Sequence, residues 1–327
     1  MAEYLVTDSD MTKVADAIRA KGGTTEALAW PDGYKTAIDA IQTGGGGGSS
    51  DPTDPVEVYN NTRPSDWLPM PTPADNEMYL LFHIPDGFSS LLAFTVTCTG
   101  NYTVALGSVS DGAFVQMIST SVASGSKYEA ELFADDYGNL TSDGHKQVMV
   151  KVSGTDILTW EPSNHSKKTS PAKFAGWNIV EISCNLPSGT SVACGSSTVN
   201  SALKKLRYFA WYGNNAVTDM TNMFYYCYSL TAIPQIDTSA VTNMNNMFNS
   251  CNSLTSIAFD NTVTGWAGYA IKLIDCSLSH AAIVAFFNSL PTITSAKAIT
   301  LTGNPGVSEL TDAEKAIATG KGWTLTL

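Results

Sequence analysis

The chain has 327 residues, 43% of them hydrophobic, and a formal net charge of −12 at pH 7. That length and apolar content suffice for two or three hydrophobic cores. The excess of carboxylates argues against nucleic acid and anionic membranes as partners, because both attract clustered Lys and Arg. No apolar run reaches the roughly 18 to 20 residues that span a bilayer. The first residues also lack the pattern of a secretory signal.

Two short helices are predicted at the start of the chain, over residues 8–20 and 33–41. Their apolar residues repeat at helical spacing, and Gly22 follows the first helix as a stop signal. Helices this short are not stable alone. Residues 1–42 are therefore predicted to be a helical docking module that binds another protein or further copies of the chain. Residues 43–55 are glycine-rich and predict a flexible linker.

Residues 56–200 alternate apolar and polar residues in short runs separated by Gly, Asn, Asp and Pro. The runs cover residues 79–84, 91–97, 102–106, 114–119, 128–133, 147–152 and 178–184. Strands of this length and spacing predict an antiparallel β-sandwich domain. Strands and helices do not alternate here, which excludes a Rossmann-type sheet.

Two later segments, residues 217–224 and 241–248, match at an offset of 24 residues, and the match continues through Cys227 and Cys251. A period in the twenties is typical of leucine-rich-repeat-like arrays, in which each repeat buries its apolar face against the next. Residues 201–327 are therefore predicted to form an α/β solenoid with a degenerate first repeat. Its closing part is expected to contain strands over 271–275, 298–302 and 323–327 and helices over 279–290 and 311–319.

The signature M-x-x-M-F-x-x-C-x-S-L-T begins at Met220 and again at Met244. It resembles the BspA-type leucine-rich repeats of bacterial surface proteins and gut prophage genomes. Residues 1–42, which include Trp30-Pro31, resemble a module on tail proteins of phages that infect Firmicutes. These resemblances imply a multidomain, mainly β tail protein with a repeat domain at its distal end. They also imply a homo-oligomer, customarily a trimer.

The six cysteines do not predict a disulfide framework. Cys227, Cys251 and Cys276 recur at nearly the same interval, which predicts a ladder of buried free thiols. Cys184 and Cys194 flank a turn and could face each other across a hairpin. A disulfide between them is disfavoured in a protein that assembles in the cytoplasm.

Motifs of catalysis and of cofactor binding are missing from the chain, so the sequence predicts neither an enzyme nor a cofactor. The histidines are scattered without metal-ligand spacing and predict no metal site: His83, His145, His165 and His280. One acidic loop offers calcium ligands, although a solvated turn is favoured: Asp135, Asp136, Asn139 and Asp143.

A group of aromatic residues is the candidate receptor-binding site. Tyr225, Tyr226 and Tyr228 replace Asn249, Ser250 and Asn252 at positions outside the apolar ladder. Three more aromatics lie one repeat earlier and are candidates to extend the same surface: Tyr208, Trp211 and Tyr212. Exposed aromatic clusters commonly stack on sugars or anchor protein partners. The alternative is that these rings pack against the sandwich at the domain junction.

The sequence thus predicts a phage tail-tip or tail-fibre receptor-binding protein located in the virion. It would attach to a host-cell surface glycan or protein by non-covalent recognition, and to other tail proteins through residues 1–42. A virion protein released by lysis needs no export signal. The alternatives are a bacterial surface adhesin, a structural tail component without receptor binding, and a glycan-degrading enzyme.

Overall fold

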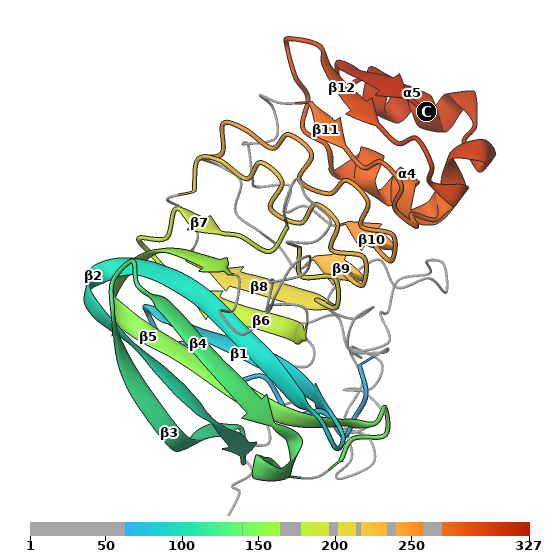
Figure 1. Ribbon diagram of the computed structural model, residues 1–327. Helices are drawn as coiled ribbons and strands as arrows, with labels where there is room; N and C mark the ends of the chain where they lie inside the picture. The colour runs from blue at the N-terminus through green and yellow to red at the C-terminus, as the bar shows by residue number, and fades with distance from the viewer. Residues whose placement is uncertain are drawn as a thin grey trace, which may run out of the picture. The chain divides into compact units, whose positions relative to one another are not determined.

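A computed structural model describes residues 63–138, 140–163, 178–195, 202–213, 217–233, 240–257 and 270–327 (Figure 1). All of these residues belong to one compact unit, residues 52–327. The predicted docking module, 1–42, and the linker, 43–55, lie outside the described residues. The described part is mainly β, as the sequence predicts.

One large mixed sheet comprises β1 (Glu77–Pro85), β2 (Ser89–Ser110), β3 (Ala113–Ala123), β4 (Lys127–Phe133), β5 (His145–Pro162), β6 (Ile179–Asn185), β7 (Ser191–Val192) and β8 (Tyr208–Tyr212). Its main order is β3-β2-β5-β1-β6-β8, with β4 added on β2 and β7 on β5. The pairs are antiparallel except β5–β7 and β6–β8, which are parallel. The predicted antiparallel sandwich is thus a single mixed sheet.

The two longest strands, β2 and β5, curve together through this sheet (Figure 1). The first part of β2 pairs with β4 and the last part with β3. Between them, Gly100 adopts a left-handed φ of 72°, and the register with β5 shifts on both sides of Thr99. Such irregularities bend a strand. Before the bend, Phe94 lies opposite Pro162 of β5, and its ring packs 5.8 Å from that of Trp160, measured between ring centroids.

The strand β1 is buried on both faces, which explains its continuous apolar sequence. One face contributes Leu80 and Phe82 to the main core. The other face contributes Tyr79 and Leu81 to a second cluster, which also contains Trp67. The segment that precedes β1 therefore covers the outer face of the sheet.

An ion pair fixes this covering segment to β6. The Glu181 side chain is completely buried, and it accepts hydrogen bonds from Arg63 Nε at 2.7 Å and Nη2 at 3.0 Å. Arg63 also donates to the Trp67 carbonyl oxygen at 3.3 Å. The guanidinium of Arg207 lies 5.1 Å from the centre of the Trp67 ring. Two guanidinium groups thus surround one buried carboxylate and one indole.

The two clearest repeats stack directly on each other, through hydrogen bonds and through their cores. Met220 N donates to Asn243 O at 2.8 Å, and the short strands β9 (Ala232–Ile233) and β10 (Ser256–Ile257) pair in parallel. The rings of Phe224 and Phe248 are stacked with centroids 5.9 Å apart. The offset of 24 residues in the sequence is therefore the spacing between equivalent, neighbouring residues.

The closing part contains β11 (Ile271–Lys272), α4 (His280–Ser289), β12 (Lys297–Thr300), η4 (Pro305–Glu309), α5 (Asp312–Thr319) and β13 (Trp323–Thr326). Both α-helices, β12 and β13 match the predicted elements to within two residues at each end, whereas β11 covers only two residues of the strand predicted over 271–275. The strands form a parallel sheet in the order β11-β12-β13. Thr311 and Glu314 form a capping box at the start of α5. Neither α4 nor α5, the α-helices of the described residues, is long and apolar enough to cross a membrane.

The predicted boundary at residue 200 lies outside the described residues, and the sheet continues beyond it. The strand β8 pairs in parallel with β6, from Glu181 opposite Tyr208 to Asn185 opposite Tyr212. Thr231 N then donates to Arg207 O at 3.4 Å, and Thr255 N to Thr231 O at 3.1 Å. The first strand of the repeat region is therefore also part of the large sheet.

All six cysteines are free and buried, which confirms the predicted thiol ladder. Each thiol of the ladder donates to a carbonyl oxygen of the preceding layer. Cys227 Sγ lies 3.4 Å from Cys194 O, Cys251 Sγ 3.1 Å from Phe224 O, and Cys276 Sγ 3.4 Å from Phe248 O. Cys194 thus lies below the ladder, and the hairpin disulfide with Cys184 is not formed.

We expect the native protein to resist thiol reagents, because burial raises the pKa of the Cys184, Cys194 and Cys251 thiols well above the ordinary value. Titration with a chromogenic disulfide reagent should give almost no reaction in buffer and six thiols per chain in denaturant. A count of four in denaturant would indicate a disulfide and contradict the ladder. Fast labelling of the native protein would show that the thiols are accessible.

Candidate functional site

The three repeat tyrosines form one cluster of partly exposed rings. The rings of Tyr225 and Tyr226 are stacked, with centroids 4.1 Å apart and planes inclined by 20°. Tyr225 Oη donates to Tyr226 Oη at 3.3 Å, which raises the pKa of Tyr225. Tyr228 meets Tyr226 edge to face at 5.8 Å, and Lys204 Nζ lies 5.9 Å from the Tyr228 ring. The cluster presents aromatic faces, hydroxyl groups and one cation.

The backbone of Tyr226 adopts an unfavourable conformation in this cluster. Its φ is +65°, in the left-handed region that bulky side chains rarely adopt. Ser250 and Asp275 adopt the same conformation in the following repeats, with φ of 59° and 54°. Short polar side chains tolerate this region better than tyrosine. The repeat therefore favours a small polar residue here, and tyrosine is retained at a cost in backbone strain.

The turn that carries the tyrosines packs closely against Gly195. A Cβ atom on Gly195 would lie 2.2 Å from Tyr225 N and 2.3 Å from Asn222 O. Gly195 N also donates to Met223 O at 2.6 Å. Only glycine permits this approach of two backbones, so the segment after β7 holds the tyrosine turn in place.

The other three aromatic residues proposed for the binding surface, Tyr208, Trp211 and Tyr212, lie on the two opposite faces of β8. Tyr208 is partly exposed and Tyr212 is 50% exposed, whereas Trp211 is only 3% exposed. Neighbouring residues of a strand point to opposite faces, which places Phe209 and Trp211 together on the buried side. The prediction that Trp211 extends the exposed tyrosine surface is therefore wrong.

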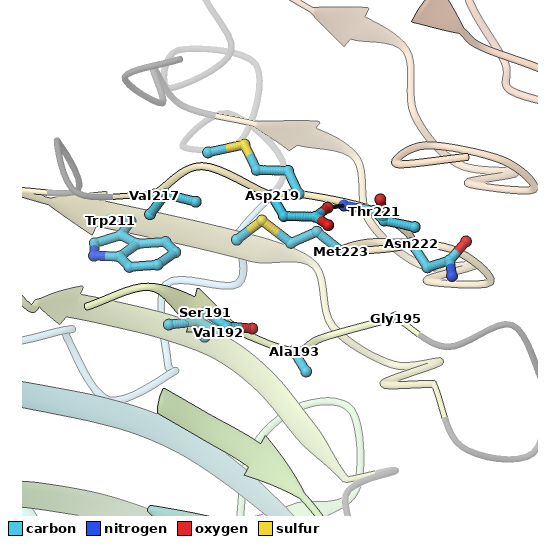
Figure 2. Close-up of a pocket in the computed structure, with 11 residues that line it drawn as sticks. Ser191, Val192, Ala193, Gly195, Trp211, Val217, Asp219, Thr221, Asn222 and Met223 are labelled. Atoms are coloured by element: carbon cyan, nitrogen blue, oxygen red, sulfur yellow. Dashed lines mark hydrogen bonds between the residues drawn. The ribbon is translucent and has the colours of Figure 1, made fainter. Parts of the chain in front are cut away.

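Trp211 instead lines a small pocket between β7 and the first clear repeat (Figure 2). Ser191, Val192 and Ala193 lie on one side of this pocket, and Trp211, Val217 and Met223 on the other. Its volume of about 50 Å³ holds a few water molecules and excludes a sugar. The Trp211 Nε1 atom is buried without a hydrogen-bond partner, which suits bound water.

A histidine cluster that the sequence does not reveal lies at the other end of the sheet. The nitrogen and carboxylate ligand atoms of His83, Asp143 and His145 lie within 4.8 Å of one another. Gln147 Oε1 accepts from Leu68 N at 2.7 Å, so its amide nitrogen faces His83 Nε2 as a donor, also at 2.7 Å. His83 therefore carries its proton on Nδ1, towards Asp143 Oδ2 at 3.9 Å. This protonation opposes metal binding at His83 Nδ1.

The predicted calcium alternative receives no support from the acidic loop. Asp135 and Asp136 lie in η1 (Ala134–Asp136), and Asn139 lies outside the described residues. Asp143 instead accepts from the hydroxyl of Thr141 at 2.5 Å. Among the described residues, the acidic side chains of this loop do not converge into a group of three or more ligands.

Comparison with known proteins bears on the repeat region. Residues 197–286 match the family described as "Mycoplasma protein of unknown function, DUF285". No curated protein and no solved structure matches the chain. The fold and this match define a mainly β protein in which residues 197–286, less than a third of the chain, are similar to that family.

Proposed function

We propose that the chain is a surface-recognition protein that binds a glycan or a protein non-covalently through Tyr225, Tyr226 and Tyr228. The observation that carries the proposal is Tyr226, a large aromatic residue in a left-handed conformation where the following repeats have Ser250 and Asp275. Strain of this kind persists at functional sites more often than elsewhere. The repeats would form the predicted α/β solenoid, with the tyrosines on its surface.

The chemistry of the cluster suits recognition without catalysis. Aromatic faces stack on the C–H faces of sugars or receive apolar side chains, and the hydroxyl groups donate and accept hydrogen bonds. Tyrosine also loses little conformational entropy on binding, since few of its bonds rotate. Gly195 and the stacked Phe224 hold the backbone beneath the rings, so the cluster is arranged before a ligand arrives.

The setting that we propose is a phage or prophage tail tip, in the virion, with residues 1–42 docked on other tail proteins. The resemblance of these residues to a phage tail module supports it. A bacterial surface adhesin is the second candidate, and the resemblance of the repeats to the BspA-type repeats of bacterial surface proteins supports it. Antibody labelling discriminates the two: purified phage particles would carry the first, and intact cells without phage would carry the second.

The substitution Tyr226→Asn separates recognition from stability. Asparagine tolerates the left-handed conformation, which offsets the lost ring contacts, so the free energy of unfolding should change by less than about 1 kcal/mol. Binding of the purified chain to a panel of Firmicutes cells and cell-wall glycans should weaken by about tenfold or more. Ser250→Asn, at the same position of the next repeat, is the matched control and should bind as the parent does. Equal binding by Tyr226→Asn would refute the site.

A further inference from the structure

The edge strand β3 is exposed on both of its faces. Within the part of the chain that the structure describes, β3 pairs with β2 alone and ends the sheet (Figure 1). Nine of its 11 residues are exposed, so neither face is covered by a second layer. Three of them are large and apolar: Val115, Met117 and Ile118, which are 47%, 59% and 58% exposed. Large apolar side chains on a free edge favour association.

This edge has almost none of the features that normally prevent association. Residues 112–126 contain no charged residue and no proline, although lysine and proline commonly protect free edges. The register with β2 shifts between Leu106 and Gly107, which leaves Met117 as a bulge. The bulge interrupts the strand once, and residues 118–123 continue in regular register beyond it. Six residues of regular edge, about 20 Å long, remain available for pairing.

We infer that residues 118–123 pair antiparallel with the same residues of a second copy of this chain, across a twofold axis. An antiparallel strand that meets itself satisfies its own edge N–H and C=O groups, so no second sequence is needed. Electrostatics favours this place of contact. Two copies with a net charge of −12 repel each other, and the repulsion costs least where an uncharged surface meets an uncharged surface.

A partly apolar cleft beside β3 adds to the same surface. The cleft has a volume of about 530 Å³ and lies among β2, β3 and β4. Leu106, Ile118, Tyr128 and Tyr137 form its apolar wall, and Glu131 and Asp136 line its polar part. Ile118 and Thr120 face it from β3. A second copy of the strand, added at the edge, lengthens the wall of the cleft and shields its apolar side chains from water. Edge pairing and apolar burial thus act together in the dimer.

Sedimentation equilibrium of the full chain tests this inference. The parent protein is expected to be a dimer at micromolar concentration, and Ile118→Lys should raise the dimer dissociation constant by about tenfold or more, because each copy then brings an unpaired charge to the edge. Leu158→Lys is the matched control. Leu158 is an exposed apolar residue of β5, 38% exposed, and its replacement adds the same charge away from β3. It should leave the dimer intact.

Ser121→Lys repeats the test with a residue that makes no apolar contact in the core, and urea unfolding of each variant shows that it is folded. A monomeric parent protein, or the trimer that the resemblance to tail proteins implies, would overturn the inference. So would a dimer that persists in both Ile118→Lys and Ser121→Lys, since the copies would then associate elsewhere. If Leu158→Lys weakened the dimer as much as Ile118→Lys does, the change in net charge would explain the effect, and the inference would also be overturned.

Discussion

Replacement of Glu181 by glutamine is expected to lower the free energy of unfolding by about 3 kcal/mol. Glutamine keeps the shape of the side chain but leaves the Arg63 guanidinium, 17% exposed, without its counter-charge. The two hydrogen bonds from Arg63, at 2.7 and 3.0 Å, favour the charged form of the Glu181 carboxylate. Urea unfolding of the parent and the variant at pH 7 measures the loss.

Two further variants establish the cause of that loss. Asp312→Asn removes one partner of an exposed ion pair with Lys315 and should cost less than about 0.5 kcal/mol. The double variant Arg63→Met, Glu181→Leu removes both charges and should recover part of the loss, because no buried charge is then left unpaired. If Glu181→Gln costs no more than Asp312→Asn, the ion pair does not hold the covering segment.

Acid is expected to destabilise the protein through His83. Burial lowers the pKa of His83 to about 3, from 6.5; Asp143 opposes this effect, and His145, Lys205 and Arg207 add to it. Between these pH values the unfolded chain binds a proton at this histidine and the folded chain does not. The free energy of unfolding therefore falls as the pH falls through this window, by about 1.4 kcal/mol per pH unit and about 4 kcal/mol in total.

The slope of stability against pH identifies the residue responsible. His83→Phe keeps an aromatic ring beside Trp67, whose ring centroid lies 4.5 Å from that of His83. It leaves Gln147 without its partner, which lowers stability equally at every pH. The slope of its free energy of unfolding against pH, between pH 6.5 and 3, should be smaller than that of the parent. The difference should correspond to about one proton bound on unfolding. An unchanged slope in His83→Phe would contradict this assignment.

Local pattern predicts most strands of the sheet, and its failures have identifiable causes. The runs 91–97 and 102–106 are predicted as two strands because Thr99-Gly100-Asn101 has the composition of a turn. In the structure Gly100 adopts a left-handed conformation inside one continuous strand, β2. The sequence of a bend and that of a turn are alike here, so the single curved sheet could not be predicted. The repeats were predictable because their period fixes which residues are neighbours.

In the candidate site, too, the local sequence predicts some features, whereas others depend on contacts between distant parts of the chain. Tyr225, Tyr226 and Tyr228 could be recognised because they depart from the repeat, but the strain at Tyr226 depends on a backbone angle that no composition reveals. Trp211 lies one repeat before the tyrosines and is therefore a candidate for the same surface, but the alternation of β8 buries it, as the alternative of packing against the sheet predicts. His83 and His145 meet because β1 and β5 pair with Pro85 opposite His145, a register that the sequence does not specify.

The parallel pairing of β6 with β8 also has a mechanical consequence. Five residue pairs, from Glu181–Tyr208 to Asn185–Tyr212, join the repeat region to the large sheet. A load that pulls the repeats away from the sheet must break this strand pair, since β8 cannot swing on a free linker. A protein that held a particle or a cell through the repeats would thus transmit tension through backbone hydrogen bonds rather than dissipate it in a hinge.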